Sequence, residues 1–114
     1  MAPRIPDSLL PFSMKVEVQQ SPYGGEYGQP VEIAKCGYDA VQGTRQTSYQ
    51  LQDGTTGLVW FNASEPNAFD VPAGSLVTVD RSASGLSTLQ CTVNASHPIV
   101  GLWGRVHHYE LEVR

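Results

Sequence analysis

The sequence predicts an all-β fold, a single small barrel or sandwich of antiparallel strands. Hydrophobic and polar residues alternate with a period of two in most segments, as in strands that bury one face. Clusters of glycine, proline and aspartate separate these segments at short intervals. The chain has 114 residues, 40% of them hydrophobic and 16% charged, which suits one folded core and is too short for two. We therefore expect five or six short strands and at most one short helix.

Residues 1–13 precede the first alternating segment and are expected to form a flexible arm. Their apolar pair, Leu9 and Leu10, lies between prolines and is too short for the apolar region of a signal peptide. A single barrel domain is expected over residues 14–114. Its first strand is predicted at 14–18, where hydrophobic residues alternate with charged ones.

A second strand is predicted at residues 31–38, after the loop SPYGGEYGQP, which is rich in glycine and proline. The segment 48–62, SYQLQDGTTGLVWFN, then predicts a β-hairpin. Asp53 and Gly54 supply its turn, because both tolerate positive φ. The return arm carries two pairs of hydrophobic residues on opposite faces: Val59 with Phe61, and Leu58 with Trp60.

The remaining elements are a second hairpin and a C-terminal segment that is either a strand or a short helix. Residues 62–74 contain two prolines, which leave room for a turn of helix at most. Residues 75–94 alternate on both sides of the turn RSASG and predict a hairpin. In residues 101–114, alternation favours a strand, whereas the spacing of several apolar residues also fits a short helix.

Three stretches resemble a known family of nucleic-acid-binding domains. YQLQDGTTGLV at 49–59, GSLVTV at 74–79 and the final HHYELEVR are similar to segments of the OB-fold of the replication protein A type. The resemblance covers roughly residues 31–113, with an extra Thr56 in the turn and no long helix in the linker. It implies a small closed five-stranded OB-type barrel that binds single-stranded nucleic acid across its second and third strands.

The resemblance also implies where the binding residues lie. Val59 and Phe61 would point into the barrel, and Leu58 and Trp60 would face outward. An outward indole offers a base a flat surface for stacking. The formal charge of −4 weakens attraction to phosphate, so the site must rely on stacking and a few local basic residues. The candidate residues for binding single-stranded DNA, or RNA, are Lys35, Tyr38, Arg45, Trp60 and Arg81.

Two ordinary structural explanations compete with this assignment. Trp60 can pack in the core or beneath a loop, as large aromatic residues usually do. Each basic residue can be an ordinary solvated surface charge. Only their convergence on one face of the barrel distinguishes a binding site from a scattered set.

A second hypothesis is an accessory OB-fold subunit that docks a larger protein partner in a nucleic-acid-processing complex. Leu102, Trp103 and Val106 form an apolar stripe near the C-terminus that fits a protein partner or a second copy of the chain. The competing interpretation is that this segment caps its own barrel. Binding of an oligosaccharide is a third option for a barrel of this kind.

The sequence gives no sign of an enzyme, a metal site or a cofactor. It has no Gly-x-Ser-x-Gly, no glycine-rich phosphate loop and no Cys-x-x-Cys. His107 and His108 are expected on opposite faces of a strand and so cannot share one ion. Cys36 and Cys91 are expected as reduced thiols packed in the core. No apolar run is long enough to span a membrane, and we expect an intracellular protein of the nucleus, nucleoid or cytoplasm.

Overall fold

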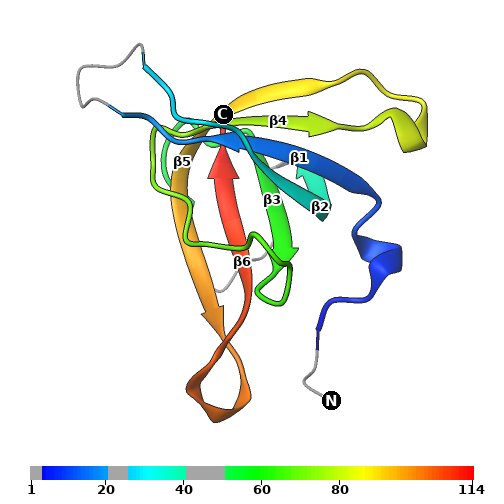
Figure 1. The fold of residues 1–114 in the computed structure, drawn as a ribbon, viewed down its shortest axis with the longest axis vertical. Coiled ribbons are helices and arrows are strands. Elements are labelled where there is room, and N and C mark those ends of the chain that lie inside the picture. The colour runs from blue at the N-terminus through cyan, green and yellow to red at the C-terminus, as the bar shows by residue number, and fades with distance from the viewer. Residues whose placement is uncertain (1–3, 21–25, 41–50) are drawn as a thin grey trace.

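Six strands close into one antiparallel barrel in the computed structural model, which describes residues 4–20, 26–40 and 51–114 (Figure 1). Their order around the barrel is β1-β2-β3-β6-β5-β4. The all-β prediction is confirmed, and six strands agree with the expected five or six, but the five-stranded barrel implied by the resemblance is wrong. The strands are β1 (Phe12–Glu17), β2 (Val31–Ala40), β3 (Gly57–Asn62), β4 (Leu76–Asp80), β5 (Leu89–Val100) and β6 (Val106–Val113). The helical elements of the described residues are the 3-10 helices η1 (Asp7–Leu9), η2 (Ser82–Ser84) and η3 (Leu102–Gly104).

The extra strand comes from the length of the last hairpin. β5 continues as far as Val100, through Asn94 and Pro98, two residues that commonly mark turns. β6 returns beside it, so the C-terminal segment is a strand and the helical alternative is wrong. Alternate residues of β6 such as Leu111 and Val113 reach the core, which is the period of a strand.

The barrel is made of two three-stranded units. In each unit, β1-β2-β3 and β4-β5-β6, consecutive strands pair with each other. The β1–β4 and β3–β6 pairs join the units and close the ring. The predicted hairpin over 48–62 is wrong in its pairing, because β3 pairs with β2 on one side and with β6 on the other. Residues 51–52 are not in a strand, and 48–50 lie outside the described residues.

The turn within that segment forms as expected. Asp53 and Gly54 make the turn, and Gly54 has φ +87°, a conformation that a glycine adopts without strain. Two other glycines lie within strands under aromatic rings. A Cβ at Gly37 would meet the Trp60 ring at 2.3 Å, and a Cβ at Gly57 would meet the Tyr38 ring at 2.6 Å. These glycines allow the two rings to lie flat on the neighbouring strand.

The core fills the interior of the barrel with aliphatic side chains, Phe61 and two thiols. Cys36 and Cys91 are both free and buried, as expected. Burial raises the pKa of Cys36 to about 12 and that of Cys91 to about 11, which keeps both thiols protonated and unreactive. The linker after β3 forms turns and closes one end of the core. Its Val71 is fully buried, and its Phe69 packs against the core cluster.

The N-terminal residues lie against the barrel from Arg4 onward. The first strand begins at Phe12, before the expected boundary at residue 14. Leu10 is 4% exposed, so the segment before β1 is anchored by a buried side chain where the sequence indicates a flexible arm. Within the described residues, the structure contains no helix capable of crossing a membrane.

Candidate binding surfaces

Trp60 lies on the outer surface of the barrel, on β3. Val59 and Phe61 point into the core and are fully buried, as expected, but Leu58, which was expected to face outward with Trp60, is only 1% exposed. The Trp60 ring packs over Gly37 of β2 and is partly exposed. Its Nε1 donates a hydrogen bond to the backbone oxygen of Leu9 at 3.1 Å. The indole is therefore neither in the core nor fully open, because the N-terminal segment lies over part of it.

Lys35 lies near this surface but is paired with an acid. Its Nζ donates to Oδ2 of Asp7 at 2.8 Å, and its backbone N–H donates to Glu65 Oε1 at 3.1 Å. The hydrogen bond from Lys35 lowers the pKa of Asp7 below its ordinary value. The charge of this lysine is therefore paired with a carboxylate of its own chain. Arg45, also expected at the site, lies outside the described residues.

Tyr38 and Arg81 meet at a different place. The Arg81 guanidinium lies over the Tyr38 ring, 5.8 Å from its centroid, as in a cation–π pair. Arg81 Nε also donates to the backbone oxygen of Ser87 at 2.9 Å. Beside the pair is a hollow of ≈ 240 Å³, lined also by Phe12 and Leu86, which we call the Tyr38–Arg81 hollow. Because consecutive residues of β2 point to opposite faces, Tyr38 cannot join Trp60, which lies over Gly37.

Acids and imidazoles surround Trp60 on the outer face of β3, β6 and β5. His108 Nε2 and Glu110 Oε2 are 2.8 Å apart, and His97 Nε2 and Glu112 Oε2 are 2.5 Å apart. We call this surface the Trp60 face. It carries no row of basic side chains among the described residues, so the expected basic track beside the indole is absent there. The alternation in HHYELEVR signals that these acids share a face, a point that sequence reasoning missed.

Glu112 is the buried centre of this polar group. It is fully buried and accepts hydrogen bonds from the Gln52 backbone N–H at 2.6 Å and from Thr55 Oγ1 at 2.8 Å. Burial opposes its ionisation, but the bonds from His97, Gln52 and Thr55 together hold its pKa below the ordinary value of 4.5. The carboxylate therefore ties the turn before β3 to β6 and β5.

His107 and His108 do not point to opposite faces. Their Nδ1 atoms are 2.8 Å apart and their rings meet edge to face, so that expectation is wrong. The ladder between β5 and β6 shifts register between Ile99 and Val100, and this irregularity lies beside the two rings. Among the described residues, no three His, Cys, Asp or Glu side chains are placed to hold a metal ion.

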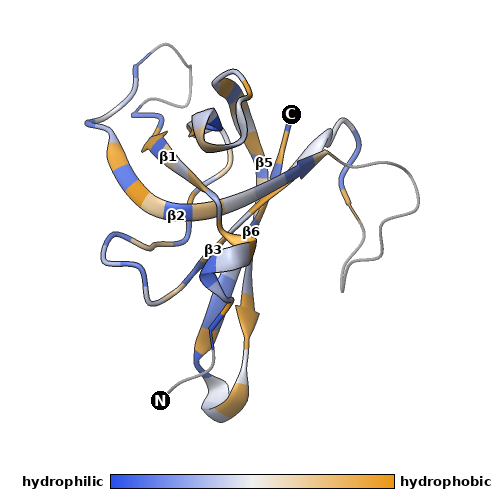
Figure 2. Cartoon of the chain, turned by 90° about the vertical axis from the view of Figure 1, so that its right-hand side faces the viewer, coloured by the Kyte–Doolittle hydropathy of each residue, from blue (hydrophilic) through white to orange (hydrophobic). Residues whose placement is uncertain are grey.

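The β5–β6 hairpin ends in an exposed apolar tip, residues 100–105, which we call the hairpin tip. Val100 is 61% exposed, Leu102 72% and Trp103 92%. The hairpin projects from the barrel in Figure 1, and its end has hydrophobic colours in Figure 2. Val106, the third predicted partner-binding residue, pairs with Val100 at the base of the tip and is half-buried. The interpretation that this segment caps its own barrel is wrong.

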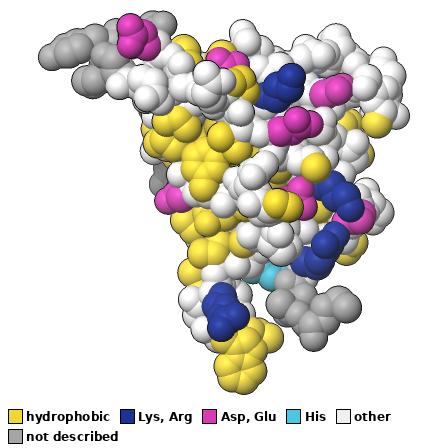
Figure 3. All heavy atoms as spheres, viewed as in Figure 1, with side chains coloured by type: hydrophobic (Ala, Val, Ile, Leu, Met, Phe, Trp, Pro, Cys, Tyr) yellow, Lys and Arg dark blue, Asp and Glu magenta, His cyan; other side chains and the backbone are white. Residues whose placement is uncertain are grey.

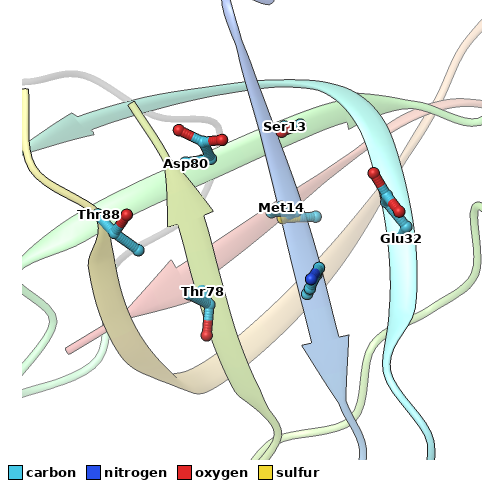
Figure 4. A pocket seen from close by; sticks show the side chains of 7 residues that line it. Ser13, Met14, Glu32, Thr78, Asp80 and Thr88 are labelled. Atoms are coloured by element: carbon cyan, nitrogen blue, oxygen red, sulfur yellow. The ribbon is translucent and has the colours of Figure 1, made fainter. Parts of the chain in front are cut away.

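A polar hollow of ≈ 380 Å³ lies over β1 and β4 (Figure 4). Hydroxyl groups of Ser13, Thr78 and Thr88 line it, together with Lys15 and two carboxylates. The described residues that line it include no aromatic ring, so it lacks the flat apolar surface on which a sugar or a base stacks. The hollow gives no support to the oligosaccharide option.

Comparison of the chain with protein-family models, with curated proteins and with solved structures finds no match. Three surfaces are therefore the candidate binding sites: the Trp60 face, the Tyr38–Arg81 hollow and the hairpin tip. Of the predicted nucleic-acid-binding residues, the structure brings Tyr38 and Arg81 together at one place, and Trp60 and Lys35 at another, where both contact residues 7–9.

Proposed function

We propose that this protein is a non-enzymatic docking subunit, an OB-type barrel that binds a larger protein partner through its hairpin tip. The observation that carries the proposal is Trp103, which is 92% exposed at the end of a projecting hairpin. Tryptophan is enriched at the energetic centres of protein interfaces, because its large ring loses much water-exposed surface on binding. Leu102 and Val100 extend the same apolar surface.

The backbone at Trp103 supports the same reading. Its φ is +68°, the left-handed region that costs an L-residue with a bulky side chain about 1–2 kcal/mol. The ring makes too little contact with the barrel to compensate, since 92% of its surface is exposed. Backbone strain that no packing in the same chain offsets is typical of sites retained for binding.

The shape and charge of the tip define the partner. A convex hairpin end with a ring at its point fits a groove lined by apolar side chains. Arg105 is exposed beside the ring, and Figure 3 shows a basic side chain next to the hydrophobic end of the molecule. A carboxylate at the border of the groove would pair with that charge.

A second candidate is binding of single-stranded nucleic acid at the Tyr38–Arg81 hollow. A guanidinium over an aromatic ring, next to an open hollow of ≈ 240 Å³, can stack a base and contact a phosphate. The chain's formal charge of −4 makes this binding weak and sensitive to salt. We rank it second, because Lys35 is matched by Asp7 and the Trp60 face is acidic.

The test begins with a photoreactive phenylalanine analogue in place of Trp103, expressed in the native host. The cross-linked protein is identified, purified and titrated against the unmodified chain and against Trp103→Gly. We expect Trp103→Gly to weaken partner binding about 30-fold, which corresponds to the loss of about 2 kcal/mol that is typical of an interface hot spot.

A matched control separates the tip from general surface hydrophobicity. Leu86 is 51% exposed in the Tyr38–Arg81 hollow, so Leu86→Ala should leave partner binding within twofold. Equal binding by Trp103→Gly and the unmodified chain would refute the proposal. A fluorescent single-stranded oligonucleotide, titrated at low salt, tests the second candidate: Arg81→Ala should weaken its binding, and Trp103→Gly should not.

A further inference from the structure

Residues 4–10 lie across the outer surface of the barrel beside β3, and we call them the N-terminal strap. The strap does not pair with any strand as part of the β-ladder. Side chains of the barrel hold its backbone instead. This arrangement differs from the rest of the chain, where the strands bind each other through backbone groups.

Asn62 is the main contact and recognises the backbone of the strap. Its side chain is 1% exposed. Its Oδ1 accepts the Ile5 N–H at 2.8 Å, and its Nδ2 donates to the Ile5 backbone oxygen at 3.0 Å. A buried amide needs both kinds of partner, and one residue of an extended peptide supplies both. Because only backbone groups are contacted, the same pair of bonds can form with any residue except proline at that position.

Two further contacts extend this recognition along the strap. Trp60 Nε1 donates to the backbone oxygen of Leu9 at 3.1 Å. Lys35 Nζ donates to Asp7 Oδ2 at 2.8 Å and selects an acid between the two backbone contacts. The order is an apolar residue, an acid two positions later and an apolar residue after two more. The backbone is extended at Pro6 and turns through the 3-10 helix η1 at Asp7–Leu9, and this turn brings the Asp7 carboxylate and the Leu9 carbonyl to the barrel.

The strap does not fill the site on which it lies. A hollow of ≈ 290 Å³ remains between the strap residues Ile5 and Leu9 and the barrel residues Leu58, Trp60, His108 and Glu110. Leu9 is 56% exposed, and of the strap residues only Leu10 is classed as buried. A segment with so little buried surface opens easily compared with the core. A peptide with larger apolar side chains would fill the hollow better.

We propose that the surface around Asn62, Trp60 and Lys35 is a binding site for a short peptide segment of another protein that adopts the backbone conformation of the strap, which occupies the site in the isolated chain. The incoming segment has an apolar residue bonded by Asn62, an acid facing Lys35 and an apolar side chain larger than leucine over the hollow. The strap competes with it, so the site opens when a better-fitting segment displaces residues 4–9 while Leu10 stays buried. This site is separate from the hairpin tip and does not depend on the function proposed for the tip.

The test uses the full chain with residues 4–9 replaced by glycine and serine at the same length. A synthetic peptide of residues 3–10, PRIPDSLL, is the probe, and NMR follows the Trp60 indole N–H and the Asn62 side-chain amide. We expect both signals to move when the strap is replaced and to return to their original positions as the peptide is added. The unmodified chain should need at least about tenfold more peptide, because its own strap has the advantage of being tethered.

A charge exchange separates peptide recognition from any general effect on folding. In the strap-replaced chain, Lys35→Glu should weaken peptide binding about fivefold, the upper range for an exposed ion pair. A peptide with lysine in place of Asp7 should recover the loss. Lys15→Glu is the matched control, because Lys15 lies in the polar hollow over β1 and should leave binding unchanged.

Three results would overturn the proposal. The first is that the signals of Trp60 and Asn62 do not return at saturating peptide. The second is that Lys15→Glu and Lys35→Glu weaken binding equally, and the third is that the exchanged peptide fails to recover it. If the strap-replaced chain does not fold, Asp7→Lys in the full chain weakens the strap through the same ion pair, and the same peptide must then bind it more tightly than it binds the unmodified chain.

Discussion

Replacing Trp103 by glycine should stabilise the fold while it removes the surface that we assign to partner binding. The residue has φ +68°, and relief of this conformation is worth about 1–2 kcal/mol. Glycine also makes the unfolded chain more flexible, which offsets about 0.4–1 kcal/mol of the gain. Almost no packing is lost, because the side chain is 92% exposed. The free energy of unfolding should therefore rise by about 0.5–1 kcal/mol.

Calorimetry and urea denaturation measure this change. A gain of that size should raise Tm by about 2–6 °C in a domain of this length. Leu102→Gly is the neighbouring control, since Leu102 is 72% exposed and does not have a positive φ. It should lower the free energy of unfolding by about 0.5–1 kcal/mol. Gly104→Ala should destabilise too, by about 1 kcal/mol, because Gly104 has φ +70° with open space around it.

The sign of the change in unfolding free energy on Trp103→Gly decides whether the backbone at residue 103 is strained. If Trp103→Gly lowers stability as much as Leu102→Gly does, the left-handed backbone stores no strain and the argument from strain fails. If Trp103→Gly is more stable and still binds the partner with unchanged affinity, the ring has no role in docking.

Three further predictions concern the other surfaces. Glu112→Gln should lower the free energy of unfolding at pH 7 by about 1.5–3 kcal/mol, because it replaces a buried, hydrogen-bonded carboxylate. The folded pKa of Glu112 lies below 4.5, so the charged carboxylate stabilises the fold fully above pH 4.5. Urea denaturation at a series of pH values should show that the difference in stability between Glu112→Gln and the unmodified chain shrinks as the pH falls below 4.5. Gly37→Ala should destabilise by about 1–3 kcal/mol and shift the Trp60 fluorescence spectrum, because its Cβ would meet the indole at 2.3 Å. Arg81→Ala should expose the Tyr38 ring, weaken oligonucleotide binding and lower the salt dependence of the binding that remains, because one phosphate contact is lost; unchanged binding at all salt concentrations would exclude the Tyr38–Arg81 hollow as its site.

The alternating pattern predicted the strands of the barrel better than their partners. Residues 57–62 were identifiable as a strand from period-two alternation, and the family resemblance indicated that Val59 and Phe61 point inward. The same alternation cannot say which strand lies alongside. Pairing of β3 with β2 and β6 depends on contacts between residues far apart in the sequence, and the Asp53-Gly54 turn suggested a local partner instead.

The candidate surfaces were only partly accessible to sequence reasoning. The apolar residues Leu102 and Trp103 were recognisable, and their exposure follows from the length of the β5–β6 hairpin, which carries them beyond the barrel. The strap was not recognisable. A short segment rich in proline resembles a disordered arm, and its contacts come from Asn62 and Trp60, more than fifty positions away.

The closed ring of strands has a consequence for how this protein associates with others. Among the described residues every strand has a hydrogen-bonded neighbour on both sides along part of its length, whereas residues 95–100 of β5, in the projecting hairpin, are paired in the ladder with β6 alone. Addition of another strand is therefore disfavoured where the ring is closed on both sides, and the projecting β5–β6 hairpin keeps a sheet edge. At the end of that hairpin a neighbouring molecule can be recognised by a projecting side chain, the indole of Trp103, and such a contact can be made and released without disturbing the fold.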